Sequence, residues 1–154
     1  MQVQETTRYR SVDEHTLAQN VVATFENLDP TNIATLRQIY TEDVCFEDPA
    51  HGIQGLETLV SCFEALYQNL DSCQFKFHKK VASSEDIFLS WTLLFRHKKI
   101  RQGEVIRVEG ASYLKTRDGK VFYHRDYFDL GAMVYENVPL LGGLIRLIRG
   151  RLGQ

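Results

Sequence analysis

A histidine and an aspartate lie two residues apart in an aromatic segment near the C-terminus. Residues 119–129 read GKVFYHRDYFD and directly follow an aspartate. This Asp-Gly pair predicts a hairpin turn that leads into a strand. Side chains alternate between the two faces of a strand, so one face is predicted to carry Phe122, His124, Asp126 and Phe128. Ionisable groups between aromatic rings are typical of an apolar ligand pocket with a few polar groups.

Asp126 is the candidate acid/base in this pocket. A carboxyl group between Phe122 and Phe128 would be shielded from water, and a shielded carboxyl group suits proton transfer at neutral pH. His124 would pair with Asp126 or transfer protons itself. The alternatives are structural: Asp126 caps a neighbouring element, or it forms a salt bridge with Arg125 of a neighbouring chain.

Asp48 and His51 are further candidates, at the end of the alternating segment 44–48. Asp48 precedes a proline, which predicts the end of a strand. Its carboxylate would either assist Asp126 or bind the backbone amides of the turn, those of Ala50 and His51. His51 lies in a loop that would border the pocket, where a solvated loop histidine is the alternative.

Two aromatic residues from other segments are expected to shape the pocket. Trp91 lies within 87–95, which is apolar on both faces and is therefore predicted to be a central strand covered on both sides. Trp91 would belong to the core or to the pocket wall. Phe25 lies on the apolar stripe of the first predicted helix, and we expect it to contact the ligand.

The sequence lacks the patterns of metal, cofactor or nucleophile sites. It has no His-x-x-x-His or Cys-x-x-Cys spacing and no Gly-rich phosphate loop. Its three cysteines lie in apolar periodic segments, which predicts buried free thiols in a reducing cytoplasm. We expect no metal, no cofactor and a cytoplasmic location.

The composition is that of one globular domain. Of 154 residues, 44% are hydrophobic and 25% charged, with a net charge of −2. This length buries a substantial core without disulfides, and the charge provides no basic field for nucleic acid. We expect no signal peptide in the polar N-terminus. No segment has the roughly 20 apolar residues of a membrane-spanning helix.

Apolar periodicity predicts three helices and then strands. The helices are predicted from Ser11 or Asp13 to Leu28, from Asp29 to Tyr40, and from Leu56 to Leu70 after a loop at 51–55. A short strand at 44–48 precedes that loop, and the strands that follow the helices are predicted at 73–81, 87–95, 105–115 and 120–128. This order predicts an α+β fold in which a curved antiparallel sheet wraps around N-terminal helices.

We expect three regions: a flexible N-terminus (1–11), the domain (12–137) and an amphipathic, cationic C-terminal helix (138–154). Such helices favour anionic membrane surfaces, so one hypothesis is that this segment contacts a membrane. The hypothesis we favour is that the helix packs on the domain, over the pocket entrance or at a dimer interface. Glycines weaken the segment as an independent helix.

The element order and several motifs resemble the SnoaL-like branch of the nuclear-transport-factor-2-like superfamily. The matching segments are 40–49 (YTEDVCFEDP), 51–52 (HG), Gly55 and 124–129 (HRDYFD). This branch includes ketosteroid isomerases, polyketide cyclases, limonene epoxide hydrolases and members that only bind ligands. The resemblance implies a cone-like sheet around a helix-lined hydrophobic pocket, and a homodimer.

The site of the ketosteroid isomerases carries over only in part. Their proton-shuttling aspartate, in a Glu-Asp-Pro motif, matches Asp48. Thr24 stands where they have an oxyanion tyrosine, and Gly110 or Ala111 where they have a protonated aspartate. Because losing one such donor costs about 10²–10³ in rate, the sequence argues against steroid isomerisation.

The comparison with the other two enzyme types centres on Asp126. In epoxide hydrolases the matching aspartate protonates the epoxide, but the uncharged segment 90–92 stands where those enzymes activate water. In SnoaL-type cyclases the matching aspartate is the acid/base of an intramolecular aldol closure. No residue of this sequence contradicts the cyclase comparison.

Two hypotheses for function follow. In the first, a cofactor-free cyclase, isomerase or dehydratase moves protons on a small hydrophobic carbonyl compound through Asp126, assisted by His124 and Asp48. In the second, the same fold is a non-catalytic module that holds an apolar ligand or assembles with a protein. The first hypothesis requires that the strand 120–128 direct its polar side chains into a sheltered cavity.

Overall fold

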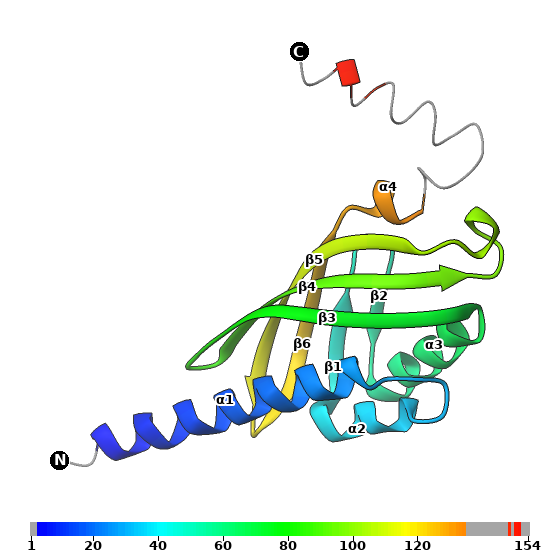
Figure 1. Ribbon diagram of the computed structural model, residues 1–154. Coiled ribbons are helices and arrows are strands. Elements are labelled where there is room, and N and C mark those ends of the chain that lie inside the picture. Colours follow the sequence, from blue (N-terminus) through cyan, green and yellow to red (C-terminus); the bar gives the residue numbers. More distant parts are fainter. Residues whose placement is uncertain (1–2, 135–147, 149, 152–154) are drawn as a thin grey trace.

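The computed structural model describes residues 3–134, 148, 150 and 151, with side chains from residue 14 onward. Within these residues six strands form one sheet in the order β2-β1-β6-β5-β4-β3. The strands are β1 (Tyr40–Glu47), β2 (Gly52–Gln54), β3 (Leu70–Ser83), β4 (Asp86–His97), β5 (Ile106–Arg117) and β6 (Lys120–Phe128). The sheet is strongly bent, and α1, α2 and α3 gather along one side of it (Figure 1). The predicted α+β, cone-like fold is confirmed.

The helices are α1 (Val3–Glu26), α2 (Leu36–Ile39), α3 (Leu56–Gln68) and α4 (Leu130–Met133), with short 3-10 helices η1 (Ile33–Thr35) and η2 (Arg101–Gly103). α1 begins well before the predicted start at Ser11 or Asp13, because no Gly or Pro interrupts the segment. The second predicted helix is shorter than expected. Its last predicted residue, Tyr40, already belongs to β1.

One neighbouring pair of strands, β1 and β6, is parallel, and the other pairs are antiparallel. The sequence predicted antiparallel strands and a loop at 51–55. β2 forms within that loop because Ile53 pairs with Phe46 of β1. Parallel neighbours require a long crossover, and here α3 and four strands intervene between β1 and β6. Local sequence patterns carry no signal for such a distant pairing.

The hairpin between β5 and β6 contains a β-bulge. Both residues of the predicted Asp-Gly turn have positive φ (52° and 73°), as a two-residue hairpin turn of this composition requires. Thr116 pairs with Val121, but the next pair is Lys115 with Tyr123. Phe122 is therefore the additional residue of a bulge, which changes the direction of the side chains that precede it.

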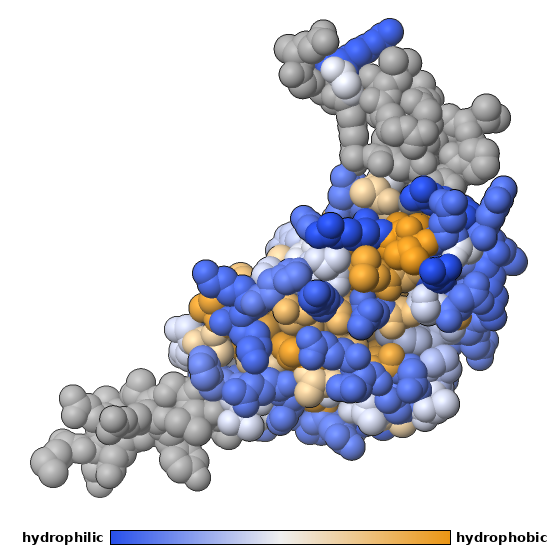
Figure 2. All heavy atoms as spheres, in the orientation of Figure 1, coloured by the Kyte–Doolittle hydropathy of each residue, from blue (hydrophilic) through white to orange (hydrophobic). Residues whose placement is uncertain are grey.

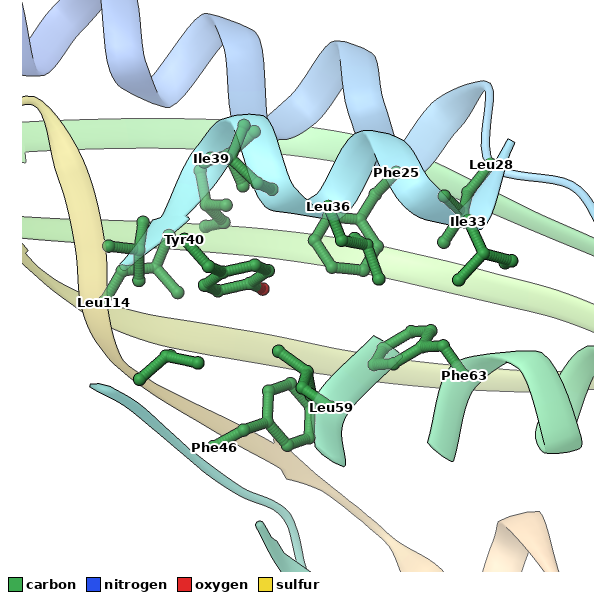
Figure 3. Packing of buried hydrophobic residues seen from close by; sticks show 14 of the residues in the cluster. Phe25, Leu28, Ile33, Leu36, Ile39, Tyr40, Phe46, Leu59, Phe63 and Leu114 are labelled. Carbon is green, nitrogen blue, oxygen red and sulfur yellow. The ribbon is translucent and has the colours of Figure 1, made fainter. Parts of the chain in front are cut away.

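The core lies between the inner face of the sheet and the helices. Tyr40, Leu36 and Leu59 are completely buried within it. Figure 3 shows the Tyr40 ring pointing into this cluster, near Leu36 and Phe25. A buried phenol hydroxyl requires a hydrogen-bond partner, and for Tyr40 that partner comes from β6.

The outer face of the sheet is only partly covered. β4 is a central strand as predicted, but Phe88 on its outer face is 52% exposed. The prediction that β4 is covered on both sides is therefore wrong. Phe88 instead stacks on Tyr113 of β5 with ring centroids 4.7 Å apart, since cross-strand aromatic pairs stabilise a half-exposed sheet. The side of the molecule in Figure 2 is largely hydrophilic, with hydrophobic residues gathered in limited areas.

The predicted C-terminal helix at 138–154 lies largely outside the described residues. Only Ile148, Gly150 and Arg151 of it are described. Its contact with a membrane, its packing over the pocket entrance and its place at a dimer interface therefore stay predictions. Among the helices that the structure describes, none combines the length and the apolar character needed to cross a membrane.

Replacing Gly110 tests how tightly β5 packs on β4. A Cβ at Gly110 would lie 2.2–2.7 Å from ring atoms of Trp91, and such overpacking typically costs about 1–3 kcal/mol. We expect Gly110→Ala to lower the free energy of unfolding by about this amount in urea denaturation. Gly52→Ala is the matched control, because a Cβ there meets no atom within 4 Å. Equal stability of the two variants would contradict the packing.

Candidate functional site

A cavity of about 310 Å³ lies between the inner face of the sheet, α3 and α4. Its wall is mainly aromatic and aliphatic, and the aromatic part includes Phe46, Phe63, Phe75, Trp91 and Phe128. The polar groups in the wall are few: Asp48, His51, Tyr67, His97, Asp126 and the thiols of Cys62 and Cys73. An apolar cavity with a small number of polar groups is typical of small-molecule sites.

Asp126 is the carboxylate of β6 that lines this cavity, and its side chain is 15% exposed. Its Oδ1 accepts hydrogen bonds from the Ser112 hydroxyl at 2.5 Å and from Nε2 of His124 at 2.7 Å. No described residue hydrogen-bonds its Oδ2. One carboxylate oxygen is therefore held in place, while the other is open to interaction in the cavity.

His124 lies behind Asp126, with a side chain that is only 4% exposed. Its Nδ1 is 2.6 Å from the hydroxyl of Tyr40. The hydroxyl has no other acceptor among the described residues, so it donates to Nδ1, and the imidazole then carries its proton on Nε2 and donates to Asp126. Tyr40 thereby selects the tautomer that supports the carboxylate.

Burial raises the pKa of Tyr40 well above its ordinary value, and the negative charge of Asp126 raises this pKa further. Because Tyr40 stays protonated, its hydroxyl remains a donor to His124 over the physiological pH range. The imidazole is enclosed by rings: Phe46 lies 4.7 Å and Phe25 6.1 Å from it, centroid to centroid. These rings exclude water from the histidine and fix its orientation.

Ser112 and Trp91 support Asp126 from the other side. The Trp91 indole N–H donates to the Ser112 hydroxyl at 2.8 Å, and Ser112 donates to Asp126. Ser112 is the direct partner of Asp126 across the β5–β6 pair. Two donor chains therefore converge on one carboxylate oxygen, which holds Asp126 in a single orientation.

Asp48 and His51 lie together in the turn between β1 and β2, and both line the cavity. Asp48 Oδ1 accepts hydrogen bonds from the backbone amides of Ala50 (2.6 Å) and His51 (2.7 Å), the turn arrangement that the sequence offered as the alternative. His51 Nδ1 is 3.0 Å from Asp48 Oδ2, and the His51 side chain is 58% exposed. Asp48 therefore stabilises the turn in addition to lining the cavity.

Phe122 does not share a face with His124 and Asp126, and this part of the sequence prediction is wrong. The bulge turns Val121 inward, where it is completely buried. Phe122 lies on the outer surface instead, with the Arg117 guanidinium 5.0 Å from its ring centroid. The other predicted aromatic residues divide: Trp91 and Phe128 line the cavity, whereas Phe25 packs behind the wall against Phe63, Phe75 and the His124 ring.

Several polar residues of the site were not predicted from the sequence, among them Tyr40, Ser112 and Tyr67. Tyr40 lies at the end of an apolar helical stripe and Ser112 in an alternating strand segment, so the sequence indicates that both side chains point toward the interior. Their partners, however, depend on the parallel β1–β6 pair and on the bulge. Tyr67 lies on the predicted apolar stripe of α3, and its hydroxyl was the available signal, because a tyrosine on a buried stripe usually has a polar partner.

At the positions where ketosteroid isomerases carry their other catalytic groups, this chain has no side chain that could donate a hydrogen bond into the cavity. Thr24 is half-buried on α1 and donates to the Asn20 carbonyl of its own helix at 2.8 Å. Gly110 packs directly against the Trp91 ring. Neither provides a donor to the cavity, which agrees with the sequence argument against steroid isomerisation.

The fold places this chain in a class of cone-like α+β domains, and in this chain the sheet and helices line an apolar cavity. A family model described as a SnoaL-like domain matches residues 21–124, more than half of the sequence. The chain therefore belongs to the SnoaL-like family. No curated protein matches the sequence.

Solved structures with the same fold share little sequence with this chain. A protein from Jannaschia sp. CCS1, described as a SnoaL-like polyketide cyclase, is 16% identical, with a TM-score of 0.70 over 80% of this chain and 92% of its own. An epoxide hydrolase from M. tuberculosis is 18% identical, with a TM-score of 0.68 over 90% and 98%. A protein with a ketosteroid isomerase-like fold from Catenulispora acidiphila is 15% identical, with a TM-score of 0.67 over 79% and 90%. These likenesses establish the fold.

The raised pKa of Tyr40 predicts how stability changes at alkaline pH. Above about pH 10 the unfolded chain releases a phenol proton that the folded chain retains. The stability from this protonated phenol is therefore complete below about pH 10 and is lost as the pH rises toward the folded-state pKa. We expect the free energy of unfolding to fall from about pH 9 to about pH 11 less steeply in Tyr40→Phe than in wild type.

At neutral pH the same variant should be less stable by about 1–3 kcal/mol, because Nδ1 of His124 loses its partner. Urea denaturation at several pH values measures both effects. Tyr127→Phe is the matched control, since Tyr127 is exposed on the outer face. A Tyr40→Phe profile that coincides with the control would contradict the hydrogen bond.

Proposed function

We propose that this protein is a cofactor-free acid/base enzyme of the cyclase, isomerase or dehydratase kind, acting on a small hydrophobic carbonyl compound with Asp126 as the proton-transferring group. The observation that carries the proposal is the Asp126 carboxylate, held on Oδ1 by two donors and open on Oδ2 in an apolar cavity. A base needs this combination of fixed geometry and an available oxygen.

The proposed step is proton abstraction next to the carbonyl group. The carbon–hydrogen bond breaks, its proton moves to Oδ2 of Asp126, and its electron pair moves toward the carbonyl oxygen as an enolate forms. Asp126 then returns a proton to carbon or oxygen, or the enolate carbon attacks a second carbonyl in a cyclisation. His124 and Tyr40 act as positioning residues, because they contact the ligand only through Asp126.

A non-catalytic binding role is the second candidate, and the geometry of Asp48 favours it in part. Asp48 accepts two backbone hydrogen bonds and faces a largely exposed histidine, so its carboxylate is occupied by the turn. A cavity with a single available carboxylate could hold an apolar ligand without turnover. The two candidates differ in whether Asp126 moves protons.

Hydrogen–deuterium exchange of a generic ketone tests the proposal without knowledge of the natural substrate. The probe is 2-tetralone in D₂O, whose protons next to the carbonyl exchange by enolate formation and are followed by NMR. We expect wild type to accelerate this exchange. Asp126→Asn should slow the protein-catalysed part by about 10²–10⁴-fold, the usual contribution of a general base.

Asp118→Asn is the matched control for this experiment. Asp118 is exposed in the hairpin turn with φ of 52°, a conformation that Asn also adopts readily, and it does not line the cavity. Its exchange rate should equal that of wild type. Undiminished exchange by Asp126→Asn would overturn the catalytic role. Binding of 2-tetralone by wild type without exchange would instead support the binding module.

A further inference from the structure

We infer that the Tyr67 hydroxyl is the donor that binds the ligand's oxygen, so that the site selects compact, uncharged, apolar molecules with a carbonyl-type oxygen. This inference rests on the proposed function for the identity of the site. It adds the group that binds the ligand's oxygen and the reason why the cavity excludes charged and polyhydroxylated molecules. Tyr67 comes from α3, whereas Asp126 comes from β6, so binding and proton transfer are assigned to different elements.

Tyr67 is a buried polar group without a hydrogen-bond partner. The residue is 4% exposed and lines the cavity. No described atom hydrogen-bonds its hydroxyl. The Cys73 thiol is close enough to the hydroxyl to affect its pKa through charge and a weak hydrogen-bonding contact, but a thiol is a poor partner and the hydroxyl lacks a well-formed hydrogen bond. Buried polar groups are normally satisfied, and because Tyr67 lines the cavity, we expect a bound ligand to supply the missing partner.

The hydroxyl is suited to donate to a carbonyl or an enolate oxygen. Burial raises the pKa of Tyr67 far above its ordinary value, and the neighbouring Cys73 adds to the effect. The phenol is therefore neutral and protonated at physiological pH. Its ring stacks on Phe63 at 6.4 Å between centroids with an interplanar angle of 29°, which holds the hydroxyl in position. A fixed donor stabilises an oxygen more strongly as negative charge develops on it.

The rest of the cavity wall limits the ligand's size and charge. The volume of about 310 Å³ is at the low end of the roughly 300–1,000 Å³ range of small-molecule sites. No Lys or Arg occurs among the described residues of this wall, and the wall has one carboxylate on β6 and one in the β1–β2 turn. Phosphates and carboxylates would lack a cationic partner there. Polyols would leave most hydroxyls unpaired against aromatic rings.

Tyr67→Phe tests the inference with two probes that differ only in oxygen. The probes are 2-tetralone and its hydrocarbon analogue tetralin, with affinities measured by calorimetry or by quenching of Trp91, which lines the same cavity. We expect the variant to bind 2-tetralone about 3- to 10-fold more weakly than wild type, the range for one neutral hydrogen bond. Tetralin should bind both proteins equally. Tyr127→Phe, on the outer face, should bind both probes as wild type does.

A structural role for the hydroxyl predicts a different pattern. If the hydroxyl stabilises the fold, Tyr67→Phe should lower the melting temperature. If the hydroxyl serves only to bind a ligand, Tyr67→Phe without ligand should melt at or above the wild-type temperature, because the substitution removes no well-formed internal hydrogen bond. The deuterium exchange of 2-tetralone should also slow by about 10²-fold in Tyr67→Phe, as for loss of one oxyanion donor.

The outcomes separate this inference from the proposed function. Equal affinity of wild type and Tyr67→Phe for 2-tetralone would overturn the role of Tyr67 while leaving Asp126 as the base. A Tyr67-dependent affinity without any catalysed exchange would support the ligand class and overturn the catalytic proposal. Failure of wild type to bind either probe would overturn both.

Discussion

The site depends on keeping a carboxylate and an imidazole together where water is almost excluded. Asp126 and His124 satisfy each other, and burial of the pair is tolerable because both imidazole nitrogens and Oδ1 of the carboxylate have partners, while Oδ2 is left for the cavity. Tyr40 supplies the donor to the imidazole, and Ser112 supplies the second donor to the carboxylate. Removing one member would leave a buried polar atom unsatisfied. The stability of this part of the fold and the orientation of the candidate base therefore share one cause.

Backbone irregularities bring these groups into register. The bulge at Phe122 places Ser112, rather than Ala111, opposite Asp126, and it directs Val121 into the core. On the neighbouring strand pair, Gly110 leaves the space that the Trp91 ring occupies, and the Trp91 indole can then donate to Ser112. A side chain at Gly110 would displace Trp91, and a regular hairpin would move Ser112 away from Asp126. Either change would disrupt the hydrogen bonds that connect Trp91, Ser112 and Asp126.

The cavity differs from the outer face in a way that matches a ligand site. Its wall is apolar, and its few polar groups come from separate elements: Asp126 from β6, Tyr67 from α3, and Asp48 from the β1–β2 turn. The outer face instead carries charged and aromatic side chains that interact in pairs. For example, the Arg125 guanidinium lies 3.0 Å from the Glu47 carboxylate. The bent sheet creates this difference, because bending encloses one face and opens the other.

The sequence by itself determined the order of the elements apart from β2, the Asp-Gly turn and the inward direction of His124 and Asp126, because these follow from local periodicity and turn chemistry. It did not determine the parallel β1–β6 pair, the bulge at Phe122 or the partners of the site. Counting from the turn would place Ala111, not Ser112, opposite Asp126. Such pairings arise from contacts between residues far apart in the chain, and one register shift changes which side chains face inward. Only the tertiary structure could therefore join Tyr40, Ser112 and Tyr67 to the site.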